Sequence, residues 1–219
     1  MKNTLRPMAL AALLVCSATA SVANASASWI DWTSASAGTL TIGSNVINVT
    51  LSGSAPIGMS YDDYYYNNSS TGGTTPSGTY QGLAPHDMVQ VNPASTFTLS
   101  FDQAIVNPYV ALVSVGQGGV PISYTFNGAI SSMSAAGNNY WGLGTGSFAG
   151  NTFTGKEYNG VLQLSGAYTS LTITTAANEY WHGFNVGAVT AVPEPETYAL
   201  LLAGLGVVGG IARRRKAKV

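Results

Sequence analysis

The chain has 219 residues, of which 46% are apolar and only 8% are charged, about a third of the charged share usual in globular proteins. This composition excludes a disordered acidic or basic tail, and the net charge of −1 gives no reason to expect nucleic-acid binding. The charges are separated along the sequence: residues 1–25 carry +2, residues 26–190 carry −6 and residues 191–219 carry +3. The two ends therefore differ chemically from the middle.

Residues 1–25 have the layout of a secretory signal peptide. Lys2 and Arg6 precede a nine-residue apolar run, 8–16, and small residues follow, with Ala23 and Ala25 in an A-x-A cleavage pattern. The run is about half as long as a helix that spans a bilayer. We therefore expect export by the Sec machinery and removal of the segment by signal peptidase.

The sequence leaves two alternatives for the processing of this segment. Cleavage after Ala20 or Ala27 is an alternative, and Cys16 is the candidate for a lipoprotein anchor, although Val15 is a poor fit because a small residue normally precedes a lipidated cysteine. Cys16 is the only cysteine of the chain. Once the signal is removed, the protein has no disulfide and no thiol nucleophile, and its core alone must hold the fold.

The other end of the chain contains three parts in order. Residues 191–197 form a linker in which Pro193 and Pro195 enforce an extended backbone. Residues 198–212 are uncharged and apolar, and as a helix they would be about 22 Å long against roughly 30 Å of hydrocarbon. Residues 213–219 form a basic tail that the positive-inside preference would hold in the cytoplasm. Its basic stop consists of Arg213, Arg214, Arg215 and Lys216.

These three parts resemble the PEP-CTERM sorting signal of Gram-negative bacteria. In that family a Val-Pro-Glu-Pro motif precedes a short apolar helix and an arginine cluster, and here the motif is Val192, Pro193, Glu194 and Pro195. The resemblance implies recognition by an exosortase, a membrane protease-transpeptidase that would remove the tail near the motif. An ordinary C-terminal membrane anchor is the alternative; it would share the topology but would not explain the prolines.

Residues 26–190 read as one all-β passenger domain. Apolar and hydroxyl side chains alternate strictly in 96–101, and Gly, Pro and Asn interrupt such runs every 8 to 15 residues. This pattern predicts an antiparallel β-sandwich or jelly roll, with a long polar loop over 65–82. The expected strands are 39–42, 46–51, 96–101, 109–115, 121–126, 147–154, 161–164, 171–175 and 180–189.

Two of these segments carry a second, less specific resemblance. Residues 107–117 and 179–187 are similar to passenger domains found on PEP-CTERM proteins of unassigned activity. The resemblance implies a sandwich but no chemistry.

No motif in the passenger indicates catalysis, a cofactor or a metal. With only two histidines, His86 and His182, a zinc site with three nitrogen ligands cannot form, and the G-x-S-x-G nucleophile elbow is absent. We expect His182 to be a packed or hydrogen-bonded strand residue. The seven carboxylates permit a glycosidase pair, but sequence does not give their separation. Asp62 and Asp63, with Asn67, are a candidate calcium site whose default interpretation is solvated loop acids.

Aromatic side chains are more suggestive. Tyr64, Tyr65 and Tyr66 stand beside the polar loop, and three consecutive rings cannot all face inward along a strand. They are candidate residues for stacking on sugar rings. For Trp141 and Trp181 we expect a place in the core, as is common for large aromatics.

The sequence as a whole predicts an exported protein that is transiently anchored in the inner membrane, with its passenger in the periplasm, before it reaches the cell surface or the medium. Its expected role is non-enzymatic: a structural or adhesive component of the cell envelope or of the extracellular polysaccharide matrix. A carbohydrate-binding module for the exopolysaccharide is the first alternative. A secreted glycoside hydrolase is the second.

Overall fold

The computed structural model describes residues 27–54, 58–60, 80, 82–83, 87–135, 144–189 and 202–206. One compact unit comprises Ala25–Ala191, and the two ends of the chain, Met1–Asn24 and Val192–Val219, do not belong to it.

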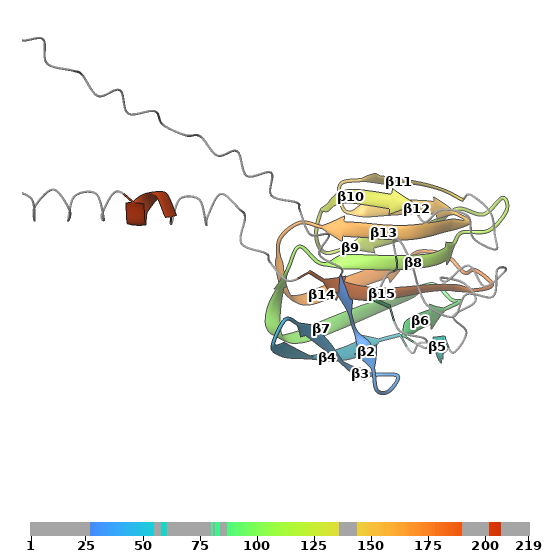
Figure 1. The fold of residues 1–219 in the computed structure, drawn as a ribbon. Coiled ribbons are helices and arrows are strands. Elements are labelled where there is room, and N and C mark those ends of the chain that lie inside the picture. The colour runs from blue at the N-terminus through green and yellow to red at the C-terminus, as the bar shows by residue number, and fades with distance from the viewer. Residues whose placement is uncertain are drawn as a thin grey trace, which may run out of the picture. The chain divides into compact units, whose positions relative to one another are not determined.

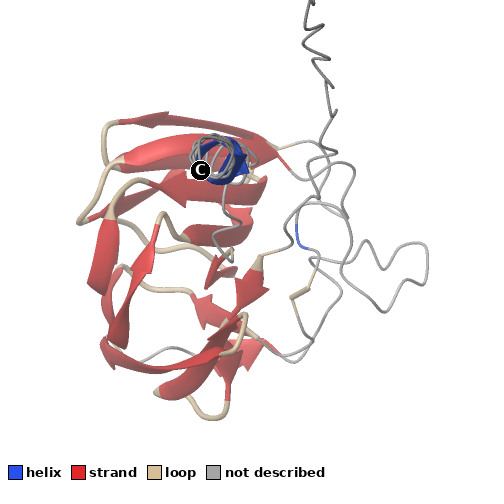
Figure 2. Ribbon diagram, turned by 60° about the vertical axis from the view of Figure 1, so that its left-hand side comes forward, coloured by secondary structure: helices blue, strands red, loops and turns tan. Residues whose placement is uncertain are grey.

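Within the described residues, the compact unit consists of two antiparallel sheets (Figures 1 and 2). The seven-stranded sheet has the order β10 (Ile130–Ala135), β13 (Tyr158–Leu164), β8 (Tyr109–Val115), β15 (His182–Ala188), β6 (Met88–Val91) and β5 (Gly58–Ser60), and β1 (Ser28–Trp29) also pairs with β15. The eight-stranded sheet has the order β11 (Thr145–Ala149), β12 (Thr152–Lys156), β9 (Ile122–Phe126), β14 (Ala167–Thr175), β7 (Ser95–Val106), β4 (Asn45–Gly53), β3 (Ala37–Ile42) and β2 (Asp31–Trp32). The predicted all-β, antiparallel class is confirmed, and the jelly-roll variant stays a prediction.

The main core lies between the two sheets. In β7 the alternation of the sequence turns Phe97 and Leu99 inward while the intervening threonines face outward. The same buried cluster contains Leu112 of β8 and Phe184 of β15, which belong to the other sheet. The two sheets therefore pack face to face, as the layers of a β-sandwich do.

The middle of the seven-stranded sheet is buried on both faces. Ala111 and Val113 of β8 point away from the main core and belong to a second apolar cluster, which also contains Tyr80 and Leu83. A strand covered on both sides has a continuous apolar run instead of an alternating one, and β8 has this pattern over residues 109–113. Trp181 is partly buried and packs against this second cluster, in agreement with the prediction for it; Trp141 lies outside the described residues.

Of the predicted strands, 109–115 has the observed bounds and most others differ only at their ends, whereas β6 and β10 were not predicted. Two predicted strands differ more strongly from the structure. Residues 147–154 were expected to form one strand, but they belong to a hairpin of β11 and β12, because the chain turns at Gly150, where φ is +60°. The last strand was expected over 180–189, but β15 begins only at His182. Tyr180 lies outside the strand and is 85% exposed.

The first and last strands of the unit pair with each other. Ser28 of β1 lies opposite Ala188 of β15 in antiparallel register. Next along the chain, the N–H of Ile30 donates to the carbonyl of Val186 at 3.0 Å. The buried side chain of Asn185 reinforces this pairing, because its Nδ2 donates to the carbonyl of Ile30 at 2.9 Å. The beginning of the passenger is thus fixed to β15, its last strand, so the two ends of the domain lie side by side.

Candidate functional site

Most residues for which the sequence predicts a functional role lie outside the described part of the chain. This holds for the signal-peptide positions Ala23 and Ala25, the candidate sugar-binding residues Tyr64–Tyr66, and both acids of the candidate calcium site. It also holds for the sorting motif Val192–Pro195 and for the basic stop Arg213–Lys216. Their roles, and the boundaries drawn around them, stay predictions.

The apolar segment 198–212 is described only in part. Residues 202–206 form a short helix, in which Leu202 and Leu205 are exposed. Among the described residues, no helix has both the length and the apolar character needed to cross a bilayer.

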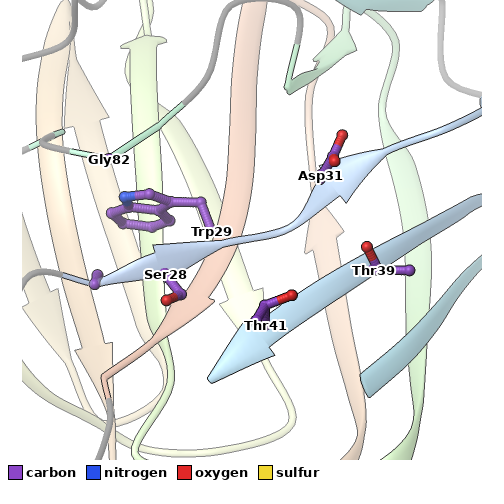
Figure 3. A pocket seen from close by; sticks show the side chains of 7 residues that line it. Ser28, Trp29, Asp31, Thr39, Thr41 and Gly82 are labelled. Atoms are coloured by element: carbon purple, nitrogen blue, oxygen red, sulfur yellow. The ribbon is translucent and has the colours of Figure 1, made fainter. Parts of the chain in front are cut away.

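An open, polar pocket of about 360 Å³ lies beside the first strands of the passenger (Figure 3). Thr39 and Thr41 enter it from β3, whereas the ring of Trp29 points toward Gly82 (Figure 3). Of the described lining residues, Asp31 alone carries a titratable side chain, so the pocket offers hydroxyl groups and one carboxylate but no acid–base pair. The lining residues are Ala27, Ser28, Trp29, Asp31, Thr39, Thr41 and Gly82.

A buried hydrogen bond connects the two sheets through the core. His182, at the start of β15, and Tyr124, in β9, are both fully buried, and Nδ1 of the imidazole lies 2.5 Å from the phenol oxygen. Burial lowers the pKa of His182 to about 4, because a charged imidazole would lose its hydration there. The imidazole is therefore neutral at pH 7, and the predicted packed, hydrogen-bonded strand histidine is confirmed.

Glu179 lies close to this pair and holds the loop that follows β8. Its Oε2 accepts the N–H of Gly116 at 2.9 Å, and its own N–H donates to the carbonyl of Asn92 at 2.8 Å. Burial raises the pKa of Glu179 to about 7; the Gly116 hydrogen bond opposes this rise, and the negative charge of Glu157 adds to it. Glu179 in turn contributes to the raised pKa of Tyr124, after the larger effect of burial.

The second carboxylate, Glu157, holds the same loop. Its Oε1 accepts the N–H of Gly118 at 2.9 Å, and its backbone N–H donates to the carbonyl of Gly116 at 2.7 Å. Both glutamates thus satisfy backbone groups of the connection between β8 and β9. The described part of the chain contains no cluster of three or more metal-ligating side chains. The hydrogen bonds of Glu179 and Glu157 therefore identify both carboxylates as anchors of the loop between β8 and β9.

A different surface, the outer face of the eight-stranded sheet, is covered with hydroxyl groups. One row of threonines crosses four strands of this sheet. In this row Thr152 of β12 lies opposite Thr125 of β9. Thr125 lies opposite Thr174 of β14, and Thr174 lies opposite Thr96 of β7. In the neighbouring rows Ser123 is paired with Thr154 and Thr172 with Thr98, and Ser52 follows next to Thr98. We name this set the hydroxyl face: Ser52, Thr96, Thr98, Ser123, Thr125, Thr152, Thr154, Thr172 and Thr174.

Neighbouring members of the hydroxyl face bond to each other. The hydroxyl oxygens are 3.1 Å apart in the pair Thr96–Thr174, 3.2 Å in Thr125–Thr152 and 2.8 Å in Ser123–Thr154. A hydroxyl group has one hydrogen to donate and two lone pairs to accept with. The pairs Thr96–Thr174 and Ser123–Thr154 therefore each keep one donor and several lone pairs for a partner. Thr152 donates to the side-chain oxygen of Asn151 at 3.3 Å, so the pair Thr125–Thr152 keeps only lone pairs. A partner that is itself hydroxylated matches this mixture.

The sequence alone could not reveal these groups as sets. Tyr124, Glu179 and His182 come from different elements, and no spacing links them. The hydroxyl face was present in the sequence as repeated Thr-x-Thr triplets, for example at 96–98, 152–154 and 172–174, but only the strand register shows that they form continuous rows.

Comparison with known proteins identifies the C-terminal segment. Residues 191–216 match the PEP-CTERM protein-sorting motif, the segment in which the resemblance was found. No curated protein and no solved structure gives a significant match to the chain. The motif implies an exported protein that is first anchored in the membrane and has an exosortase as its processing partner. The chain thus carries a PEP-CTERM protein-sorting motif at residues 191–216.

Proposed function

We propose that this protein is a non-enzymatic structural or adhesive component of the cell envelope or of the extracellular polysaccharide matrix. The sorting motif at 191–216 carries the proposal. After Sec export and removal of residues 1–25, the segment 198–212 holds the protein at the inner membrane with its passenger in the periplasm. An exosortase then cuts near Val192–Pro195, and the passenger reaches the cell surface or the medium.

The chemistry of the passenger supports this role. Glu157 and Glu179 accept hydrogen bonds from backbone N–H groups, and His182 bonds Tyr124 inside the core, so these polar groups hold the fold together. The net charge of −6 over residues 26–190 keeps the processed passenger from adhering to anionic lipid. Such a domain suits a location outside the membrane.

Processing is tested by the intact mass of the protein recovered outside the producing cells. We expect the wild-type protein to lack residues 1–25 and 198–219. The double variant Pro193→Ala/Pro195→Ala should remain mostly in the membrane fraction with its tail attached, because the extended site presented to the exosortase is lost. Pro93→Ala, in a loop of the passenger, is the control and should be processed normally. Wild-type extracellular protein that still contains residues 198–219 would contradict exosortase processing.

A second candidate function, binding of the matrix polysaccharide, is supported by the hydroxyl face. Neutral polysaccharides present closely spaced hydroxyl groups, and the face offers the matching donors and acceptors. Sheets twist by about 20–25° per strand, so a face of five strands turns through roughly 100°. A rigid planar ligand would contact only a few of these strands, whereas a polymer chain can follow the twist.

The binding experiment separates this face from the tyrosines predicted as sugar-binding residues. We expect the passenger to be retained by the host exopolysaccharide and the Thr98→Val/Thr174→Val variant to bind about 30-fold more weakly, since about two hydrogen bonds worth about 1 kcal/mol each are lost. Valine keeps the branched shape that suits a strand. Tyr64→Ala/Tyr66→Ala is the matched variant: loss of binding there alone would assign the site to the tyrosines. No binding by the wild-type passenger would exclude both.

A further inference from the structure

The two sheets have long, open edges on one side of the passenger. β10 and β11 are the terminal strands of their sheets and contain six and five residues, whereas the opposite edges, β5 and β2, contain three and two. Among the described residues, each long edge strand has a strand partner on one side only, β10 with β13 and β11 with β12. The N–H of Ile130, at the start of β10, is already bonded to the carbonyl of Gly150 at 2.8 Å, so the available part of this edge begins after it. The other side of an edge strand presents backbone N–H and C=O groups that another strand can bind.

The connection between the sheets places these two edges together. β12 and β13, the neighbours of the edge strands, follow each other directly through Glu157. Phe153 of β12 and Tyr158 of β13 pack with their ring centroids 4.7 Å apart. Figure 1 likewise shows β10 and β11 at the same side of the unit.

Apolar side chains at this side are incompletely covered. Met133 of β10 lies opposite Leu162 and Phe148 of β11 lies opposite Phe153, so both share a face with core residues. Nevertheless, Met133 is 39% exposed and Phe148 is 38% exposed. The inner layer of the passenger is therefore open to a partner along this rim.

The charges at this side do not oppose association. Neither edge strand contains a charged residue or proline, the devices with which proteins commonly block pairing at sheet edges. The nearest charge on the adjoining strand is Lys156, opposite Thr145, and Glu157 follows it directly with the opposite charge. The described aspartates, at positions 31, 87 and 102, belong to other parts of the fold.

We propose that the edge formed by β10 and β11 is a self-association surface, on which a second copy of this chain extends both sheets by antiparallel strand pairing. A twofold axis brings the same edge of the two copies together, so the exposed Met133 and Phe148 side chains are covered by their counterparts. Strand pairing supplies the backbone hydrogen bonds, and the two apolar side chains supply the buried area. This inference rests on the structural role proposed above and deepens it, because it names a second copy of the chain as a partner of the structural component.

The test is sedimentation equilibrium of the passenger, residues 26–190, which contains every described strand and both apolar clusters. We expect concentration-dependent association of the wild-type passenger. Met133→Lys and Phe148→Lys should each weaken it about 100-fold, because twofold symmetry would bring the two introduced charges together in the interface. Val106→Lys is the matched control: this exposed valine ends β7, an interior strand of its sheet, and the change should leave association as in the wild type.

Circular dichroism melts of all four proteins show whether each variant is folded. A wild-type passenger that stays monomeric at millimolar concentration would overturn the proposal. This is the result expected if another segment of the same chain covered the edge. Association that survives both edge substitutions, or that is lost equally in the control, would also overturn it. None of these results changes the expected processing of the tail or the recovery of the passenger in the matrix, so the two proposals fail independently.

Discussion

Replacement of Phe184 by alanine is expected to lower the free energy of unfolding by about 3–5 kcal/mol, the usual cost of removing a buried phenylalanine ring. Phe184 is fully buried in β15, where its ring lies 5.6 Å from Phe97 of the opposite sheet and 6.5 Å from Tyr124. Removal of the ring leaves a cavity between the layers, and the surrounding strands can close it only in part. Urea unfolding at pH 7, followed by circular dichroism, measures the change.

Tyr180→Ala is the control for this experiment. The tyrosine is 85% exposed, so its loss should change the free energy of unfolding by less than about 0.5 kcal/mol. Similar losses in both variants would mean that Phe184 does not lie in the shared core of the two sheets.

A substitution at Gly116 should have a comparable effect for a different reason. Its φ is +80°, a region that costs other residues about 1–2 kcal/mol. A Cβ there would also come within 2.2 Å of the carbonyl oxygen of Gly155, a backbone atom of β12. Since Gly116 also donates to Glu179, Gly116→Ala would have to displace both the strand and the anchored loop. We expect a loss of about 3 kcal/mol or more in the free energy of unfolding.

Gly119 provides a matched control in the same loop. Its φ is +93°, but a Cβ at this position has no neighbouring heavy atom within 4 Å. Gly119→Ala therefore measures the backbone strain alone, about 1–2 kcal/mol. The difference between the two variants, obtained by the same urea unfolding, gives the cost of the close approach to β12. Equal losses would show that no such approach exists.

The fold class was predictable because burial leaves a local signature in each strand. The prediction for 109–115 agrees with β8, since a segment that is apolar except for Ser114 is bounded by Asn107-Pro108 and by Gly116. The hairpin of β11 and β12 was missed because alternation continues on both sides of Gly150-Asn151, although that dipeptide is itself a turn signal. β1, β2 and β5 are too short for any periodicity to appear.

The functional surfaces were less predictable, since they depend on pairing between distant segments. β10 reads Ile-Ser-Ser-Met-Ser-Ala. In this sequence the single exposed methionine stands among small, mostly polar residues and does not attract notice as part of a surface. That this strand ends a sheet, beside the end of the other sheet, follows only from the strand order. The sorting signal, in contrast, is contiguous in sequence, and its recognition from residues 191–216 required no structure.

The antiparallel pairing of Ser28 with Ala188 has a consequence for both of the proposed cleavages. Ala25 precedes Ser28 by three residues and Pro193 follows Ala188 by five, so extended chain reaches at most about 10 Å and about 18 Å from this strand pair to the two positions. Before the two proposed cleavages, the signal segment and the anchor segment both leave the domain close to this one strand pair. A peptide bridge of a few residues could also join the two ends into a closed ring.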